Sequence, residues 1–246
     1  MDLTLKKQIV ASMRLASCFS ILFALCCGLM SMIFSKTMTA YDNREAGAAL
    51  HSKIIVLDAG HGGEDGGTVG TNGVLEKDLN LDMSESLGVY LKFAGFEVVQ
   101  TRTEDILLYD RNVNYKGRKK VLDLAARYKI AEELRPDLFM SIHMNAFPDS
   151  RYSGLTVYYS PNNDQSYNAA YTVRSEVIDK LQPNNNRELK KAGSSIYLLN
   201  RLRCPSILVE CGFLSNQEEC SMLSTEGYRH KLSLILFSSL SSFFQE

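Results

Sequence analysis

The sequence predicts an α/β fold, a three-layer sandwich in which helices flank a mostly parallel central sheet. Short apolar runs typical of strands buried on both faces alternate with helical patterns along the chain. One of these runs, 138–142, leads directly into a histidine, and another, 54–57, ends four residues before one. The 246 residues are 45% hydrophobic and 22% charged, which is ordinary for one sizeable globular domain with an appendage. Strands that alternate with helices indicate a largely parallel sheet.

Residues 1–36 are predicted to be a signal peptide or a signal anchor. Three basic residues precede an uncharged run, 15–34, of about 20 residues, which is long enough to cross a bilayer as a helix. Basic residues before such a run favour leaving that side in the cytoplasm. We therefore expect the remainder of the chain to be exported, and to be either secreted or tethered to the cytoplasmic membrane. The basic residues are Lys6, Lys7 and Arg14.

A folded domain is expected over 53–246, after a polar linker at 37–52. Its first helix is indicated by apolar residues that recur every four positions and form one helical face. They are Leu79, Met83, Leu87 and Leu91. Further helices are predicted at 119–134, 168–181 and 228–243, with loops at 103–116 and 182–193. Ser215 and Glu218 form a plausible capping box for one more short helix.

The remaining apolar segments are predicted to be strands of one sheet. They are short, and several are rich in β-branched and aromatic residues. The predicted strands are 54–57, 96–101, 138–142, 155–159, 196–199 and 206–209.

Charge and cysteine content exclude some classes of protein. The net charge of −1 gives no reason to expect nucleic acid as a partner. Three cysteines lie in the predicted domain, at positions 204, 211 and 220, and their spacing matches neither a zinc ribbon nor a disulfide framework. Small buried thiols are the better interpretation.

Four polar side chains are expected at one edge of the sheet. His61, His143 and Glu210 each follow a predicted strand, and Glu76 opens the helix after the His61 loop. The carboxyl ends of parallel strands share an edge, where ligands bind in α/β proteins. Two imidazoles and one carboxylate make a three-ligand zinc site with an open fourth position. The spacing does not decide whether Glu76 or Glu210 is the ligand. The alternative to a metal site is a pair of hydrogen-bonded core histidines beside two solvated glutamates.

Several neighbours of these residues are candidates for supporting roles. Asp58 is a candidate to orient His61 by accepting a hydrogen bond, and a plain buried polar residue is the alternative. Asn145, Arg187 and Lys190 are candidate substrate contacts, although a solvated loop explains the last two equally well.

Four segments, in order, resemble the signatures of the zinc-dependent N-acetylmuramoyl-L-alanine amidases of bacterial cell walls. The segments are 57–63, 75–80, 141–145 and 209–216. The resemblance implies one zinc ion per chain, bound by His61, Glu76 and His143. It also implies that Glu210 is the general base and acid while a zinc-bound water attacks the substrate.

The resemblance further implies the substrate, which is peptidoglycan cut between the lactyl group of N-acetylmuramic acid and L-alanine. Residues 108–110, residues 119–124 and Cys211 look most like the amidases that trim spore cortex. An accessory protein is a candidate partner, and the uncharged run at 15–34 predicts membrane contact only through the N-terminal segment. A zinc peptidase or deacetylase with the same four residues, and a wall-binding module without turnover, are the alternatives.

Overall fold

A computed structural model describes residues 53–110, 112 and 117–245 of the chain. The predicted N-terminal segment, 1–36, and the predicted linker, 37–52, lie outside these described residues. Within the described part, no helix combines the length and apolar character that crossing a membrane requires.

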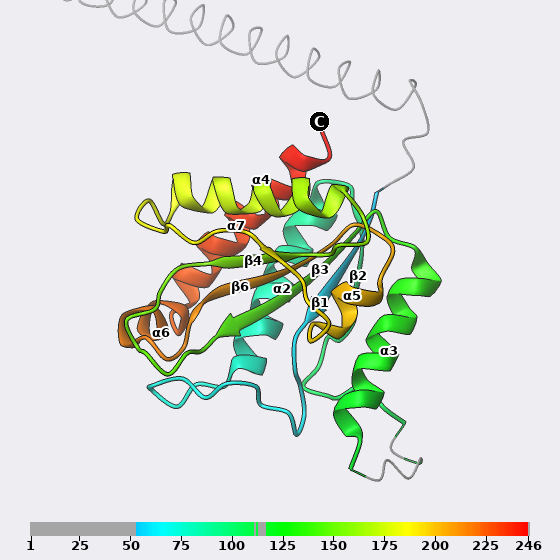
Figure 1. Cartoon of the computed structure of the whole chain (residues 1–246), viewed down its shortest axis with the longest axis horizontal. Coiled ribbons are helices and arrows are strands. Elements are labelled where there is room, and N and C mark those ends of the chain that lie inside the picture. Colours follow the sequence, from blue (N-terminus) through cyan, green and yellow to red (C-terminus); the bar gives the residue numbers. More distant parts are fainter. Residues whose placement is uncertain (1–52, 111, 113–116, 246) are drawn as a thin grey trace, which may run out of the picture. The chain divides into compact units, whose positions relative to one another are not determined.

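The described residues form one six-stranded sheet in the order β2-β1-β3-β6-β4-β5 (Figure 1). The four strands from β2 to β6 in this order are parallel, β4 runs antiparallel to β6, and β5 is parallel to β4. The predicted mostly parallel sheet is therefore confirmed. The strands are β1 (Ile54–Ala59), β2 (Glu97–Gln100), β3 (Leu138–Asn145), β4 (Thr156–Tyr159), β5 (Lys190–Lys191) and β6 (Ser206–Phe213).

Helices cover both faces of the sheet, which gives the predicted three layers (Figure 1). On one face α2, α4 and α7 pack against one another and the strands, and on the other face α3 and α5 pack together. The short helix α6 lies beside β6 and α7. The helices are α2 (Glu76–Phe93), α3 (Lys119–Leu134), α4 (Gln165–Lys180), α5 (Tyr197–Arg201), α6 (Gln217–Leu223) and α7 (Glu226–Phe243).

Alternate residues of the central strands enter two separate cores. Ile55 and Leu57 join the larger core, under α2, α4 and α7, whereas Val56 joins the smaller core, under α3 and α5. All three side chains are fully buried. This burial on both faces explains why these strands read as continuous apolar runs rather than as alternating ones.

Two local predictions are wrong. The segment 196–199, predicted to be a strand, leads into α5, whose Leu198 and Leu199 are buried in the smaller core. An apolar run of four residues does not distinguish a strand from a buried helix segment. The cap of α6 is Asn216, which accepts hydrogen bonds from two backbone N–H groups, while Ser215 instead accepts one from Phe147 N.

Candidate metal and catalytic site

The His61 loop follows β1 directly and carries an unusual backbone. His61 has a φ of 62°, in the left-handed region that residues with a Cβ rarely adopt. Gly62 and Gly63 also have positive φ values, which glycine tolerates without a steric cost. Backbone hydrogen bonds in both directions between Gly62 and Asp65 close the turn. The glycines thus let the chain reverse sharply and direct the imidazole of His61 back over the sheet edge.

His143 lies on β3 and its ring packs against the His61 loop. The two imidazole centroids are 5.0 Å apart, with the ring planes at 77°. Gly60 stands beneath the ring of His143, and a Cβ there would come within 2.2 Å of its Cε1 atom. The absence of a side chain at Gly60 therefore lets the two rings approach each other.

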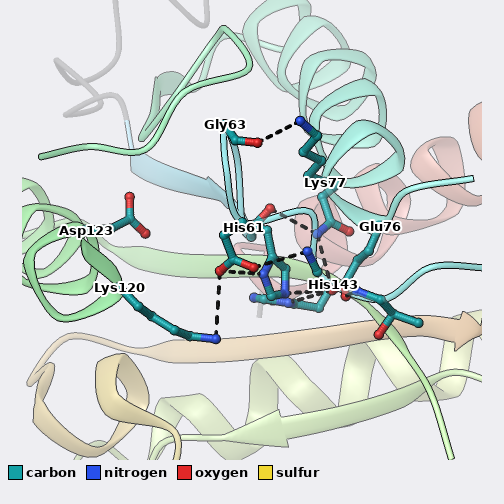
Figure 2. Close-up of polar contacts among 12 residues, drawn as sticks. His61, Gly63, Glu76, Lys77, Lys120, Asp123 and His143 are labelled. Carbon is teal, nitrogen blue, oxygen red and sulfur yellow. Dashed lines mark hydrogen bonds and ion pairs between the residues drawn. The ribbon is translucent and has the colours of Figure 1, made fainter. Parts of the chain in front are cut away.

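Glu76 begins α2 and lies between the two histidines. Its carboxylate is 3% exposed. Oε1 lies 2.9 Å from Nδ1 of His143 and 3.2 Å from Nε2 of His61, and Oε2 accepts a hydrogen bond from Thr68 N. Figure 2 shows both rings converging on this carboxylate. The N-terminus of a helix is a favourable place for a buried negative charge.

The protonation states of this triad follow from its contacts. Burial alone would raise the pKa of Glu76, but hydrogen bonds from His143 and His61 and their charges outweigh it and hold that pKa far below its usual range. Burial lowers the pKa of His61, and contacts with Glu76 and Asp65 more than compensate, so the pKa is raised overall. Glu76 is therefore ionised and ready to act as an anionic ligand.

Glu210 supplies the second carboxyl group at the same edge. It pairs with His143 in the parallel register of β3 and β6. Its Oε2 atom is buried and has no hydrogen-bond partner among the described residues. Burial raises the pKa of Glu210, and the charge of Glu76 adds to this rise against the opposing effects of His143 and His61. A carboxyl group with a raised pKa near two imidazoles is suited to proton transfer.

The structure places Asp58 differently from the prediction that it orients His61. Its buried carboxylate accepts hydrogen bonds from Thr101, Arg127 and Ser141. The carboxylate beside His61 is that of Asp65, whose Oδ2 lies 2.9 Å from Nδ1. Asp58 therefore does not serve as the acceptor for His61, because strand alternation turns it toward α3 instead.

The three predicted substrate contacts lie in different surroundings. Asn145 ends β3, and its Oδ1 accepts a hydrogen bond from Ala146 N. The guanidinium of Arg187 stacks over Phe213, 4.3 Å from the ring centroid, beside a groove of about 400 Å³. Lys190, on β5, lies near enough to Glu210 for its charge to lower the pKa of that carboxyl group. All three remain candidates for substrate contact.

The residues that support His61 do not stand out in the sequence. The contact of Asp65 with His61 could have been predicted from one feature only: Asp65 stands four residues after His61 in the same glycine-rich loop. Arg127 was hidden in α3, where its spacing of four residues from Asp123 reads as an ordinary helix ion pair. Its 1% exposure shows instead that it is a core residue.

The fold and the site together define a class of protein. This is a three-layer α/β enzyme whose sheet edge joins a His–Glu–His cluster of metal-ligand type to a second carboxyl group, that of Glu210. The model of the N-acetylmuramoyl-L-alanine amidase family matches residues 55–240. The chain therefore belongs to the N-acetylmuramoyl-L-alanine amidases.

Individual relatives agree with this assignment. The germination-specific N-acetylmuramoyl-L-alanine amidase of Bacillus subtilis is 34% identical over 197 residues, which cover 80% of this chain and 82% of that protein. The amidase AmiA of Escherichia coli is 25% identical over 85% of this chain and 82% of its own length.

Solved structures show the same fold. The CwlD amidase of Clostridioides difficile, solved in complex with the GerS lipoprotein, has a TM-score of 0.74 and 34% identity over 78% of this chain and 98% of that one. The amidase AmiC2 of Nostoc punctiforme has a TM-score of 0.68 and 29% identity, over 79% and 98% of the two chains.

Proposed function

We propose that this amidase is zinc-dependent and that His61, Glu76 and His143 hold the ion. One ligand atom from each residue lies within 4.8 Å of those of the other two. The separations of 3.2 Å and 2.9 Å that join Glu76 to the imidazoles are close to the roughly 3.3 Å between ligand atoms around a tetrahedral zinc ion. This geometry is the observation that carries the proposal.

Two imidazoles and one carboxylate leave a fourth position open, as catalytic zinc sites do. When bound, zinc supplies Lewis-acid chemistry that lowers the pKa of a water ligand and stabilises negative charge on a carbonyl oxygen. Glu210 takes the proton of the attacking water and gives it to the departing amine of alanine. Its raised pKa supports both roles, because the group must hold the proton between the two steps.

The proposed substrate is the amide bond between the lactyl group of N-acetylmuramic acid and L-alanine, in spore cortex rather than vegetative wall. The 34% identity to a germination-specific amidase supports this choice. Peptidoglycan lies outside the cytoplasmic membrane, so the predicted segment at 1–36 would deliver the domain to its substrate. Asn145, Arg187 and Lys190 are the proposed substrate contacts.

Incubation of the purified full-length chain with cortex and vegetative peptidoglycan, with and without added zinc, tests this proposal. We expect zinc-dependent release of stem peptides that begin with L-alanine, and faster release from cortex. Full activity of the chelated enzyme would rule out the zinc mechanism, and equal rates on both walls would rule out the cortex preference.

The product also separates the alternative chemistries. A zinc peptidase would leave the lactyl–alanine bond intact, and a deacetylase would release acetate. CwlD was solved in complex with a lipoprotein. An accessory protein for this chain stays a prediction, and the activity of the purified chain alone tests whether one is needed.

A further inference from the structure

Two buried arginines hold the backbone of the His61 loop by its carbonyl oxygens. Arg102 Nε donates to Ala59 O at 2.9 Å, and its Nη2 donates to Gly60 O at 3.0 Å. Arg127 Nη1 also donates to Ala59 O, and its Nη2 donates to His61 O, both at 2.7 Å. The carbonyls of three consecutive residues, including His61 itself, are therefore fixed by guanidinium groups.

These contacts act where the backbone needs support. His61 holds its left-handed conformation although it has a Cβ, and such conformations persist only when their surroundings over-determine them. The hydrogen bond from Arg127 to the carbonyl of His61 fixes the peptide unit that follows this residue. The direction of the imidazole toward Glu76 thus depends on a group on the far side of the loop.

Arg127 is itself anchored by two carboxylates, one on its own helix and one on β1. Its Nε donates to Asp123 on α3 and its Nη1 to Asp58 on β1. Asp58 is fixed in turn by the hydroxyl groups of Thr101 and Ser141. Arg102 differs, because all its hydrogen bonds within the described part of the chain go to backbone carbonyls, those of Glu104 and Lys77 included. Arg102 and Arg127 are only 2% and 1% exposed, so water does not replace these contacts.

We propose that Arg127, assisted by Arg102, is a positioning residue that presets His61 for zinc. This inference rests on the proposed zinc site and identifies what orients one of its ligands. The two arginines bind neither substrate nor zinc in this proposal. They act by fixing the carbonyls of the loop before the ion arrives. The loop then loses less conformational entropy when zinc binds, and the affinity for zinc is higher.

Arg127→Lys tests this role in the full-length protein. Lysine keeps the positive charge between Asp58 and Asp123, but a single ammonium group does not reach both carboxylates and the carbonyls of Ala59 and His61 together. The matched control is Arg229→Lys, because Arg229 also donates to one carboxylate, that of Asp82, and to one backbone carbonyl, that of Leu223. Arg229 lies on α7 and has no part in the proposed site.

Two readouts are measured well below the unfolding midpoint of each variant. The first is zinc affinity by competition with a chelator, which we expect to fall about 10- to 100-fold in Arg127→Lys and to stay unchanged in Arg229→Lys. The second is hydrogen–deuterium exchange of peptides covering 60–67 in the metal-free protein. We expect this exchange to become at least about tenfold faster in Arg127→Lys only, because the turn opens more often.

The outcomes distinguish this inference from the proposed function. If the parent binds zinc and Arg127→Lys keeps the zinc affinity and loop exchange of the parent, Arg127 is only a core residue and the inference is overturned. If the parent binds no zinc, the proposed function fails, and the exchange measurement alone decides whether the arginines hold the loop. Should Arg127→Lys not fold, Arg102→Lys takes its place with the same two readouts.

Discussion

The imidazole of His143 lies so close to the backbone of Gly60 that residue 60 has no room for a side chain. A Cβ at this position would stand 2.2 Å from Cε1 and 2.3 Å from Nε2 of the ring. The φ of Gly60 is not in the left-handed region, so the requirement for glycine comes from the ring and not from the backbone.

Gly60→Ala should therefore displace His143 without unfolding the domain. The added methyl group displaces the ring of His143 and breaks the contact between its Nδ1 atom and Glu76. We therefore expect zinc affinity to fall by more than about tenfold, and amidase activity to fall with it. Chelator competition and peptidoglycan digestion measure the two effects. The matched control is Gly227→Ala on α7, where an added Cβ meets no atom within 4 Å. Zinc affinity in Gly60→Ala equal to that of the parent would contradict the packing argument.

Asp58→Asn should destabilise the protein in a way that depends on pH. Burial alone would raise the pKa of Asp58, but the charge of Arg127 and three hydrogen bonds hold the pKa below its ordinary value. Removing one partner of a buried ion pair costs about 3–5 kcal/mol. Because the pKa of Asp58 is lower in the folded state, its ionised carboxylate stabilises that state at pH values above its pKa in the unfolded chain, about 3.9. This contribution is lost as the pH falls through the pKa of the folded state.

We therefore expect the difference in unfolding free energy between parent and Asp58→Asn to be largest at pH 7 and to narrow below about pH 4. Urea unfolding at several pH values measures it. Asp82→Asn is the control, because Asp82 pairs with Arg229 at a half-exposed position and should cost at most about 1 kcal/mol. A difference that stays constant down to pH 3 would mean that Asp58 gains nothing from being ionised.

The architecture and the four central residues of the site were predictable because each depends on a local pattern. Buried parallel strands appear as apolar runs, and His143 and Glu210 directly follow such runs in the sequence, while His61 comes four residues after one. α3 begins and ends at the predicted residues, because the left-handed Arg135 and the following proline stop it.

The support of the site was not predictable, because it depends on contacts between distant segments. Arg127 reaches Asp58 across 69 positions in the sequence, and nothing in α3 distinguishes it from a surface arginine. Asp58 shows the same limit. The sequence left open whether it is an acceptor for His61 or a plain buried polar residue, and only the fold shows that its side chain is directed toward α3.

Cys211→Ala should leave turnover close to that of the parent. Cys211 follows Glu210, but its side chain turns to the opposite face of β6 and is fully buried in the larger core. Burial raises the pKa of this thiol, which keeps it neutral and unreactive. We expect a loss of about 1 kcal/mol in unfolding free energy from the lost packing, measured by urea unfolding. Loss of activity in a folded, zinc-loaded variant would place the thiol in the chemistry.

Glu76 and Glu210 should respond differently to substitution. Glu76→Ala removes the carboxylate that contacts both imidazoles, so zinc affinity and activity should fall together. Glu210→Gln keeps the shape of the side chain but removes the proton acceptor. It should retain zinc while turnover falls by roughly two to four orders of magnitude. Metal analysis and peptidoglycan digestion of the two purified variants measure these effects.

Glu210→Gln should also change stability, with a sign that follows from its pKa. Because burial raises the pKa of Glu210 above the unfolded value of about 4.3, the ionised carboxylate destabilises the metal-free folded state at pH 7. The neutral amide removes this cost, so the metal-free variant should be more stable than the parent at pH 7, and the gain should vanish below about pH 4. Such a variant, more stable but slower than the parent, is expected if the carboxyl group of Glu210 serves catalysis and destabilises the fold. If Glu210→Gln lost its zinc while Glu76→Ala retained it, Glu210 would be the zinc ligand and Glu76 the proton acceptor.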